Sequence, residues 1–187
     1  AVNTMGTDTI AAWGICDKLD MLIWLLADAM GPALTTYTAQ NMGAGRWDRV
    51  CKGNRIGAAM SVAAVGAVSL VLYFLTGPLG GLFVPVQDAP AVVPQAVAFM
   101  RRMAPFFLFY ALAESFSGAC CGTGDTVRPM ILTLLSICLL RVLGILLLLP
   151  RQHTMECIID IYIASWIAAG IGFLSLWQWE KKGVQKA

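Results

Sequence analysis

Three acidic side chains lie close together in an otherwise apolar stretch near the start of the chain. Asp17, Asp20 and Asp28 occur among leucines, isoleucines and a tryptophan. On an α-helix, at about 100° per residue, they fall within about 80° of one another and form one acidic stripe. The same face carries Trp24, Thr35 and Thr38. An ionisable side chain at membrane depth costs about 2.5 to 3.5 kcal/mol on insertion scales, so it usually faces a polar cavity. We expect the acidic stripe to bind protons or cations in a cavity lined by Trp24, Thr35 and Thr38.

A fourth carboxylate, Glu114, stands in a later apolar stretch. Phe107 and Tyr110 share its helical face, within about 60°. Aromatic rings attract cations through the negative charge of their faces. Glu114 is therefore a candidate site for a cation such as Na⁺, with Phe107 and Tyr110 lining the cavity beside it.

These acids also have a structural interpretation, in which they neutralise one another or pair with a base and hold helices in register. Lys18 lies about 100° from Asp17 on the helix and is not an obvious partner. Arg141 stands in the middle of another apolar run. We expect it to pair with an acid or with a carbonyl group at a helix end.

The composition determines the class of protein that must position these residues. Of 187 residues, 58% are hydrophobic and 13% are charged, and the mean hydropathy is +0.72. Soluble domains carry about 25% charged residues, so this chain is an integral membrane protein. The same numbers exclude disorder. An excess of only two positive charges, dispersed along the chain, excludes a nucleic-acid groove.

The apolar stretches predict an all-α, polytopic bundle of about five transmembrane helices. A helix crosses the hydrocarbon with about 20 apolar residues. The expected spans are residues 9–42, 56–77, 96–121, 129–150 and 157–180. Short loops rich in glycine and proline separate them, so residues 1–187 form one compact bundle.

Basic residues in short loops remain on the cytoplasmic side of a membrane. Eight of them lie in alternate loops and the C-terminal tail, namely Arg46, Arg49, Lys52, Arg55, Arg128, Lys181, Lys182 and Lys186. The C-terminus is therefore predicted to be cytoplasmic, and five spans place the N-terminus outside. Because the first residues lack the pattern of a signal peptide, we expect at least one further span before Ala1.

No sequence pattern indicates an enzyme. The chain contains no HExxH, GxSxG, Walker or dinucleotide-binding motif. The GTGDT segment at residues 122–126 lacks the lysine of a phosphate-binding loop. The six cysteines lie mostly in apolar runs without a CxxC pair and are interpreted as buried thiols in lipid-facing or helix-packing positions.

Two segments resemble the multidrug and toxic compound extrusion (MATE) family of secondary antiporters. AAWGICDKLDMLIWLLADAMGPALTTYTAQNMGAGRWDRV, at residues 11–50, ends like the family's Q-N-x-G-A-G motif before a basic loop. AESFSGACCGTGDTVRPM, at residues 113–130, is similar to the family's G-x-L-R-G-x-G-D-T segment, with Cys120 and Cys121 in place of Leu-Arg. The motif residues are Gln40, Asn41, Gly43, Gly45, Gly118, Gly122 and Asp125.

The resemblance implies half of a two-lobed, twelve-helix transporter. The chain resembles helices eight to twelve, a partial C-terminal lobe, without helix seven and the N-terminal lobe. Glu114 matches the acid of helix ten, and one of the three aspartates would supply the acid of helix eight. The acid of helix seven has no counterpart.

The implied function is H⁺- or Na⁺-coupled efflux of cationic drugs by alternating access in the cell inner (plasma) membrane. The expected partners are the lipid bilayer, the missing lobe and a cationic small molecule; neither nucleic acid nor a cofactor other than the coupling ion is expected. Burial favours the protonated form of a carboxyl group, which suits a proton carrier. Because rocking of one bundle against another needs both lobes, we expect transport only with the missing lobe. The alternatives are a lipid-linked sugar flippase of the same superfamily and a membrane scaffold or subunit that does not transport.

Overall fold

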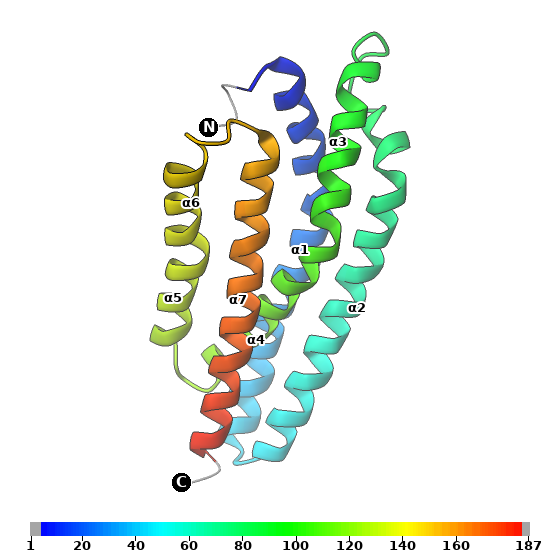
Figure 1. The fold of residues 1–187 in the computed structure, drawn as a ribbon. Helices are drawn as coiled ribbons and strands as arrows, with labels where there is room; N and C mark the ends of the chain where they lie inside the picture. Colours follow the sequence, from blue (N-terminus) through cyan, green and yellow to red (C-terminus); the bar gives the residue numbers. More distant parts are fainter. Residues whose placement is uncertain (1–4, 185–187) are drawn as a thin grey trace.

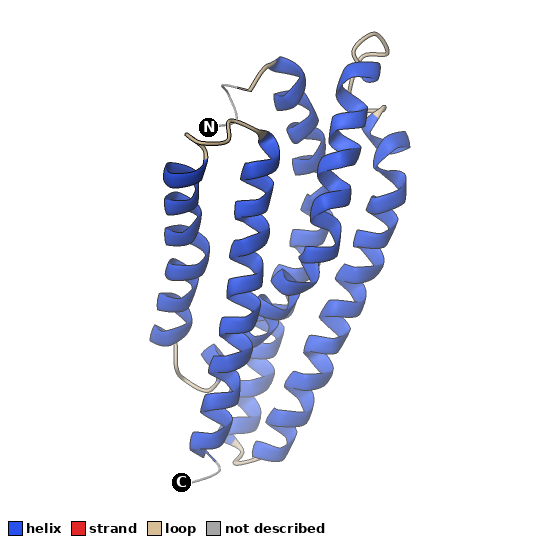
Figure 2. Cartoon of the chain, in the orientation of Figure 1, coloured by secondary structure: helices blue, strands red, loops and turns tan. Residues whose placement is uncertain are grey.

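The computed structural model describes residues 5–184 as a bundle of long helices, with no strand among those residues (Figures 1 and 2). The helices are α1 (Thr7–Gly43), α2 (Trp47–Gly80), α3 (Ala89–Met103), α4 (Phe107–Gly122), α5 (Val127–Thr133), α6 (Leu140–Leu148) and α7 (Met155–Val184). A 3₁₀ turn at Ala104–Phe106 joins α3 to α4. A π-helical turn at Leu134–Leu139 joins α5 to α6. The predicted all-α membrane helix bundle is confirmed.

Four helical rods in the described part of the chain are long and apolar enough to cross a membrane. They are α2, α3 with α4, α5 with α6, and α7. The longest helix, α1, is not among them, and its apolar sequence contains Asp17, Lys18, Asp20 and Asp28. The first expected span, residues 9–42, lies inside α1, whereas residues 129–150 extend two residues beyond the end of α6.

The expected span at residues 96–121 is divided between α3 and α4. Pro105 lies in the 3₁₀ turn between them. Proline lacks an N–H group and its ring collides with the carbonyl four residues earlier, so it interrupts an α-helix. This break lies one turn before the segment that carries Tyr110 and Glu114.

Helix α1 is held between three others. It packs against α2, α3 and α4, and α4 also packs against α7. The rod of α5 and α6 stands beside α7 at one side of the bundle (Figure 1), and α6 buries none of its residues. The helices that bear the predicted acids, α1 and α4, are therefore direct neighbours in the interior.

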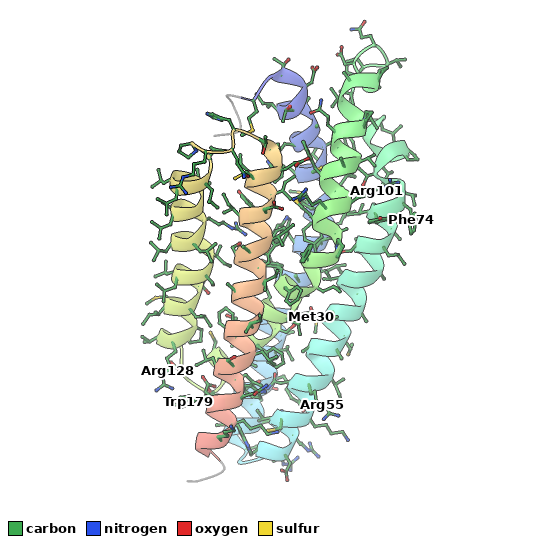
Figure 3. The ribbon with its side chains drawn as sticks, viewed as in Figure 1. Met30, Arg55, Phe74, Arg101, Arg128 and Trp179 are labelled. Carbon is green, nitrogen blue, oxygen red and sulfur yellow. The ribbon has the colours of Figure 1, made fainter. Side chains whose placement is uncertain are left out.

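The two ends of the bundle differ in charge. The α1–α2 turn, the α4–α5 loop and the C-terminal end of α7 lie at the lower end in Figure 1. Arg55 and Arg128 are near that end in Figure 3, whereas Arg101 lies in the upper half. The basic segments found by sequence thus gather at one end of the bundle.

Candidate functional site

Small residues allow α1 and α4 to approach until their backbones touch. A Cβ atom added to Gly118 would overlap the carbonyl group of Gly31, and one added to Gly122 would lie 2.6 Å from the Thr35 carbonyl oxygen. The Thr35 hydroxyl lies 3.0 Å from the carbonyl oxygens of both Gly31 and Gly118. Small residues at helix interfaces permit such close packing in membranes. The contact fixes the register of α1 against α4.

This contact brings two carboxylates from different helices together. Glu114 precedes Gly118 by one turn, and its Oε2 would lie 3.5 Å from a Cβ atom on Gly31. Asp28 precedes Gly31 by almost one turn and accepts a 2.7 Å hydrogen bond from the Tyr110 hydroxyl. Tyr110 precedes Glu114 by one turn on α4, so Asp28 and Glu114 both lie at this contact between α1 and α4. We call Asp28, Tyr110 and Glu114 the acidic pair site.

The acidic pair site is open to its surroundings. Asp28 is exposed and Glu114 is half-buried, whereas Tyr110 is buried. A carboxylate that the protein leaves uncovered within a membrane bundle has to face a water-filled cavity or a further helix. The site can therefore receive a cation or a proton from outside the described bundle.

Aromatic rings surround one side of the acidic pair site. The Trp24 ring centroid lies 4.4 Å from that of Tyr110, in an edge-to-face arrangement. Phe107 lies 6.2 Å and Trp166 lies 5.9 Å from Trp24. These rings come from α1, α4 and α7, and they form one aromatic cluster beside two carboxylates. An organic cation is stabilised by this combination of charge and ring faces.

Arg141 contacts the far side of the aromatic cluster. Its Nε donates a 2.9 Å hydrogen bond to the Ser165 hydroxyl, and its guanidinium carbon lies 4.1 Å from the Tyr162 ring centroid. None of the ion pairs found in residues 5–184 includes Arg141. The expectation that it pairs with an acid or a helix-end carbonyl is therefore wrong. The facing side of α7 offers a hydroxyl and aromatic rings at this depth.

The three aspartates of the acidic stripe have different surroundings. Asp17 is exposed, and Asp20 is only 5% exposed. Asp20 Oδ1 has no hydrogen-bond partner among the described residues. Asp20 lies one turn after Cys16, whose thiol donates to the Ala96 carbonyl oxygen of α3 at 3.3 Å. Asp28 alone of the three is bonded to Tyr110, so only one aspartate of the stripe belongs to the acidic pair site.

The threonines and the phenylalanine expected to line the cavity are used for packing. Thr38 is fully buried and bonds to Asn54 of α2 at 2.8 and 3.1 Å. Thr35 bridges α1 and α4 as described above. Phe107 is fully buried in the core. Of the residues expected at the cavity, Tyr110 belongs to the acidic pair site and Trp24 packs against it.

The motif residues serve helix contacts and turns. Gly118 and Gly122 form the close contact with α1. Gly45 adopts a φ of 67° in the turn between α1 and α2, a conformation that glycine tolerates best. Asp125 Oδ1 accepts from the Arg128 backbone N–H at 3.2 Å at the start of α5. Asn41 donates to the Tyr37 carbonyl oxygen at 2.9 Å. Gln40 and Gly43 are exposed at the end of α1.

Two polar side chains in the interior, Ser165 and Glu180, were not predicted from the sequence. Ser165 holds Arg141, and the only sequence signal is its position among the aromatic residues of α7. Glu180 is 7% exposed and accepts a 3.1 Å hydrogen bond from Thr123. Its place in a basic tail predicts a solvated side chain, so no pattern indicated burial. In residues 5–184 no group of three or more His, Cys, Asp or Glu side chains is arranged to hold a metal ion.

Comparison with known proteins gives a family match. The MatE family model matches residues 1–147. The probable multidrug resistance protein YoeA of Bacillus subtilis is 21% identical over 136 residues, which are 73% of this chain and 29% of that protein. The probable multidrug resistance protein NorM of Thermotoga maritima is 26% identical over 132 residues, 71% of this chain and 28% of that protein. The chain therefore spans less than a third of the length of these relatives.

Proposed function

Because the chain belongs to the MatE family, we propose that it is part of a secondary active transporter that exports cationic small molecules in exchange for H⁺ or Na⁺. The names of the two relatives as multidrug resistance proteins support the export of drugs. The apolar helical rods support a place in the membrane. The proposed chemistry is the binding and release of ions, in which only the O–H bonds of protonated carboxyl groups form and break.

The observation that carries this proposal is the acidic pair site. Asp28 and Glu114 come from two helices and lie at one contact between α1 and α4, where Asp28 bonds to the Tyr110 hydroxyl. Ionisable groups inside membrane bundles are candidates for ion pathways because their insertion is costly. Two neighbouring carboxylates repel each other when both are charged. A proton, a Na⁺ ion or an organic cation would each relieve this repulsion.

Exchange follows if these cations compete for the same carboxylates. An organic cation would place its charge against Asp28 and Glu114 and its apolar part against Trp24 and Tyr110. Entry of H⁺ or Na⁺ would neutralise the carboxylates and release the organic cation. Binding of one cation then excludes the other, which is the requirement for antiport.

Alternating access would need more protein than the described bundle. Transporters of this type rock one helical repeat against another around a central site. We infer that a second lobe covers the exposed side of Asp28. The α1–α2 turn, the α4–α5 loop and the C-terminal end of α7, which carry the basic residues, lie at the lower end in Figure 1. This arrangement supports a cytoplasmic C-terminus in the plasma membrane.

Two other functions fit the site less well. A flippase for lipid-linked sugars has to accommodate a pyrophosphate, which favours basic residues, whereas the acidic pair site carries two carboxylates. In a scaffold that does not transport, Asp28 and Glu114 would only stabilise helix contacts. Their loss would then change stability and leave transport intact.

Efflux from cells that express the intact protein tests the proposal. Glu114→Gln keeps the shape of the side chain and removes its charge. Glu156→Gln is the matched control, since Glu156 is an exposed acid near the start of α7, beside Arg102. We expect Glu114→Gln to abolish the efflux of ethidium and to insert normally, and Glu156→Gln to retain efflux. Efflux at the wild-type rate in Glu114→Gln cells would refute the proposed role.

A further inference from the structure

One side of α2 is exposed and apolar over the whole thickness of a membrane. From Ile56 to Leu75, every exposed side chain of α2 is apolar. The exposed positions recur every three or four residues and so form one continuous face, which we call the α2 stripe. Over these residues the helix rises about 29 Å at 1.5 Å per residue. The hydrocarbon core of a bilayer is about 30 Å thick, so the α2 stripe has the length to face acyl chains across the membrane.

Two basic residues follow the α2 stripe at its lower end. Lys52 and Arg55 are exposed, and Arg55 is seen near the lower end of α2 in Figure 3. At about 100° per residue, Lys52 lies on the stripe and Arg55 at its edge. Lys52 stands four residues before Ile56, which is about 6 Å along the helix axis. The polar headgroup layer of a bilayer is about 5 to 8 Å deep on each side, so both charges lie at the depth of lipid phosphate groups.

The charges at the start of α2 are not neutralised within the described part of the chain. Arg46, Arg49, Lys52 and Arg55 are all exposed, and Asp48 is the one acid in α2. None of the ion pairs found in residues 5–184 includes any of these five residues. With Asp48 counted against the four bases, residues 46–55 carry a net charge of +3.

The neighbouring segments add to this positive charge. Asp125, just before α5, is paired with Arg128 at 3.2 Å. At the end of α7, Glu180 is buried, whereas Lys181 and Lys182 are exposed. Together, residues 40–56, 121–130 and 176–184 contain seven basic residues and three acids. A positive potential therefore surrounds the lower end of the α2 stripe.

We propose that the start of α2 binds an anionic phospholipid of the adjacent leaflet, with its phosphate group at Lys52 and Arg55 and an acyl chain along the α2 stripe. Charge complementarity supports this occupant, because each basic residue beside the membrane surface adds to the attraction of anionic lipid. The apolar stripe favours a lipid over a free phosphate ion. This surface belongs to α2 alone, whereas the acidic pair site lies between α1 and α4, so the inference does not rest on the proposed transport.

Native mass spectrometry of the intact protein in detergent tests this proposal. The probes are phosphatidylglycerol and phosphatidylcholine with identical acyl chains. Lys52→Gln and Arg55→Gln each remove one positive charge from an exposed side chain that makes no ion pair in the described chain. The matched control is Lys182→Gln, which removes one exposed charge at the same end of the bundle but from α7.

We expect the wild type to retain phosphatidylglycerol in preference to phosphatidylcholine. Lys52→Gln and Arg55→Gln should each lower that preference about fivefold, the factor that corresponds to about 1 kcal/mol for one basic residue beside anionic lipid. Lys182→Gln should leave it unchanged. No preference in the wild type, or a preference that survives both changes in α2, would overturn the proposal. An equal fall in all three variants would also overturn it, because it would show a general attraction without a site.

Another helix of a longer protein is the competing occupant of the α2 stripe, and thermal unfolding of the intact protein in detergent distinguishes it from lipid. Ala63 is exposed in the middle of the stripe, whereas Ala58 is 4% exposed on the packed side of α2. Ala63→Leu should leave the unfolding temperature unchanged, because fluid acyl chains or detergent adapt to a larger side chain. Ala58→Leu, the control, should lower it by overpacking. A similar fall in Ala63→Leu would mean that a helix covers the stripe and would overturn the proposal.

Discussion

The Tyr110 hydroxyl donates a 2.7 Å hydrogen bond to Asp28, and this bond joins α4 to α1 next to Glu114. The Tyr110 ring simultaneously packs edge-to-face against Trp24, at 4.4 Å between centroids. One side chain therefore links the carboxylates to the aromatic cluster. Substitutions at Tyr110 can therefore test the hydrogen bond and the ring contact separately.

Tyr110→Phe should remove the hydrogen bond and keep the ring contact. We expect a loss of about 0.6 to 1.5 kcal/mol in the free energy of unfolding, the range for one hydrogen bond between side chains. Tyr110→Leu also removes the ring and should cost more, since an aromatic pair contributes about 0.5 to 1.5 kcal/mol beyond its buried area. Thermal unfolding in detergent measures both. Equal losses in the two variants would show that the ring contact with Trp24 contributes nothing.

Gly118→Ala should disrupt the contact between α1 and α4. The added Cβ atom would collide with the Gly31 carbonyl group, which belongs to a helix backbone and cannot rotate away. Overpacking of this kind costs about 1 to 3 kcal/mol. Unfolding experiments should show this loss together with weaker efflux, because Asp28 and Glu114 would separate.

Gly14→Ala is the matched control for that substitution. Gly14 is also a helical glycine, but nothing lies within 4 Å of an added Cβ atom. Alanine has the higher helix propensity by about 1 kcal/mol, so Gly14→Ala should be neutral or stabilising. A similar loss in both variants would mean that the close contact at Gly31 does not determine the effect.

Arg141 and Ser165 should behave as one unit. Removal of either side chain breaks the 2.9 Å bond between α6 and α7. Arg141→Gln and Ser165→Ala should therefore be non-additive, with a coupling of about 0.5 kcal/mol or more in a double-mutant cycle of unfolding. Additive losses would indicate that the ring contact with Tyr162 alone holds Arg141.

Sequence patterns predicted the helices well because apolar length is a strong signal. The runs that form α2, α5 with α6, and α7 exceed the thickness of a bilayer core, and loops rich in glycine and proline separate them. The break at Pro105 was not predicted. A proline in an apolar run is compatible with a kinked continuous helix as well as with a 3₁₀ turn.

The candidate site was only partly predictable. Helical periodicity placed Asp28 with Asp20 on one face, but it could not tell which neighbour covers each residue. Asp20 lies buried one turn from a cysteine that bonds to α3, whereas Asp28 meets Tyr110 of α4. Which aspartate meets α4 depends on where α1 and α4 touch. Gly31 and Gly118, which are distant in the sequence, determine that point of contact. Arg141 was assigned the wrong kind of partner for the same reason.

Competition between cations measures the central claim most directly. The binding of tetraphenylphosphonium to the purified intact protein would be followed by calorimetry at several Na⁺ concentrations and pH values. If Asp28 and Glu114 form a shared site, added Na⁺ or a lower pH will weaken binding in the wild type, because occupied or protonated carboxylates no longer attract the organic cation. Glu114→Gln should bind more weakly and lose this dependence. An affinity in the wild type that neither Na⁺ nor pH alters would contradict the shared site.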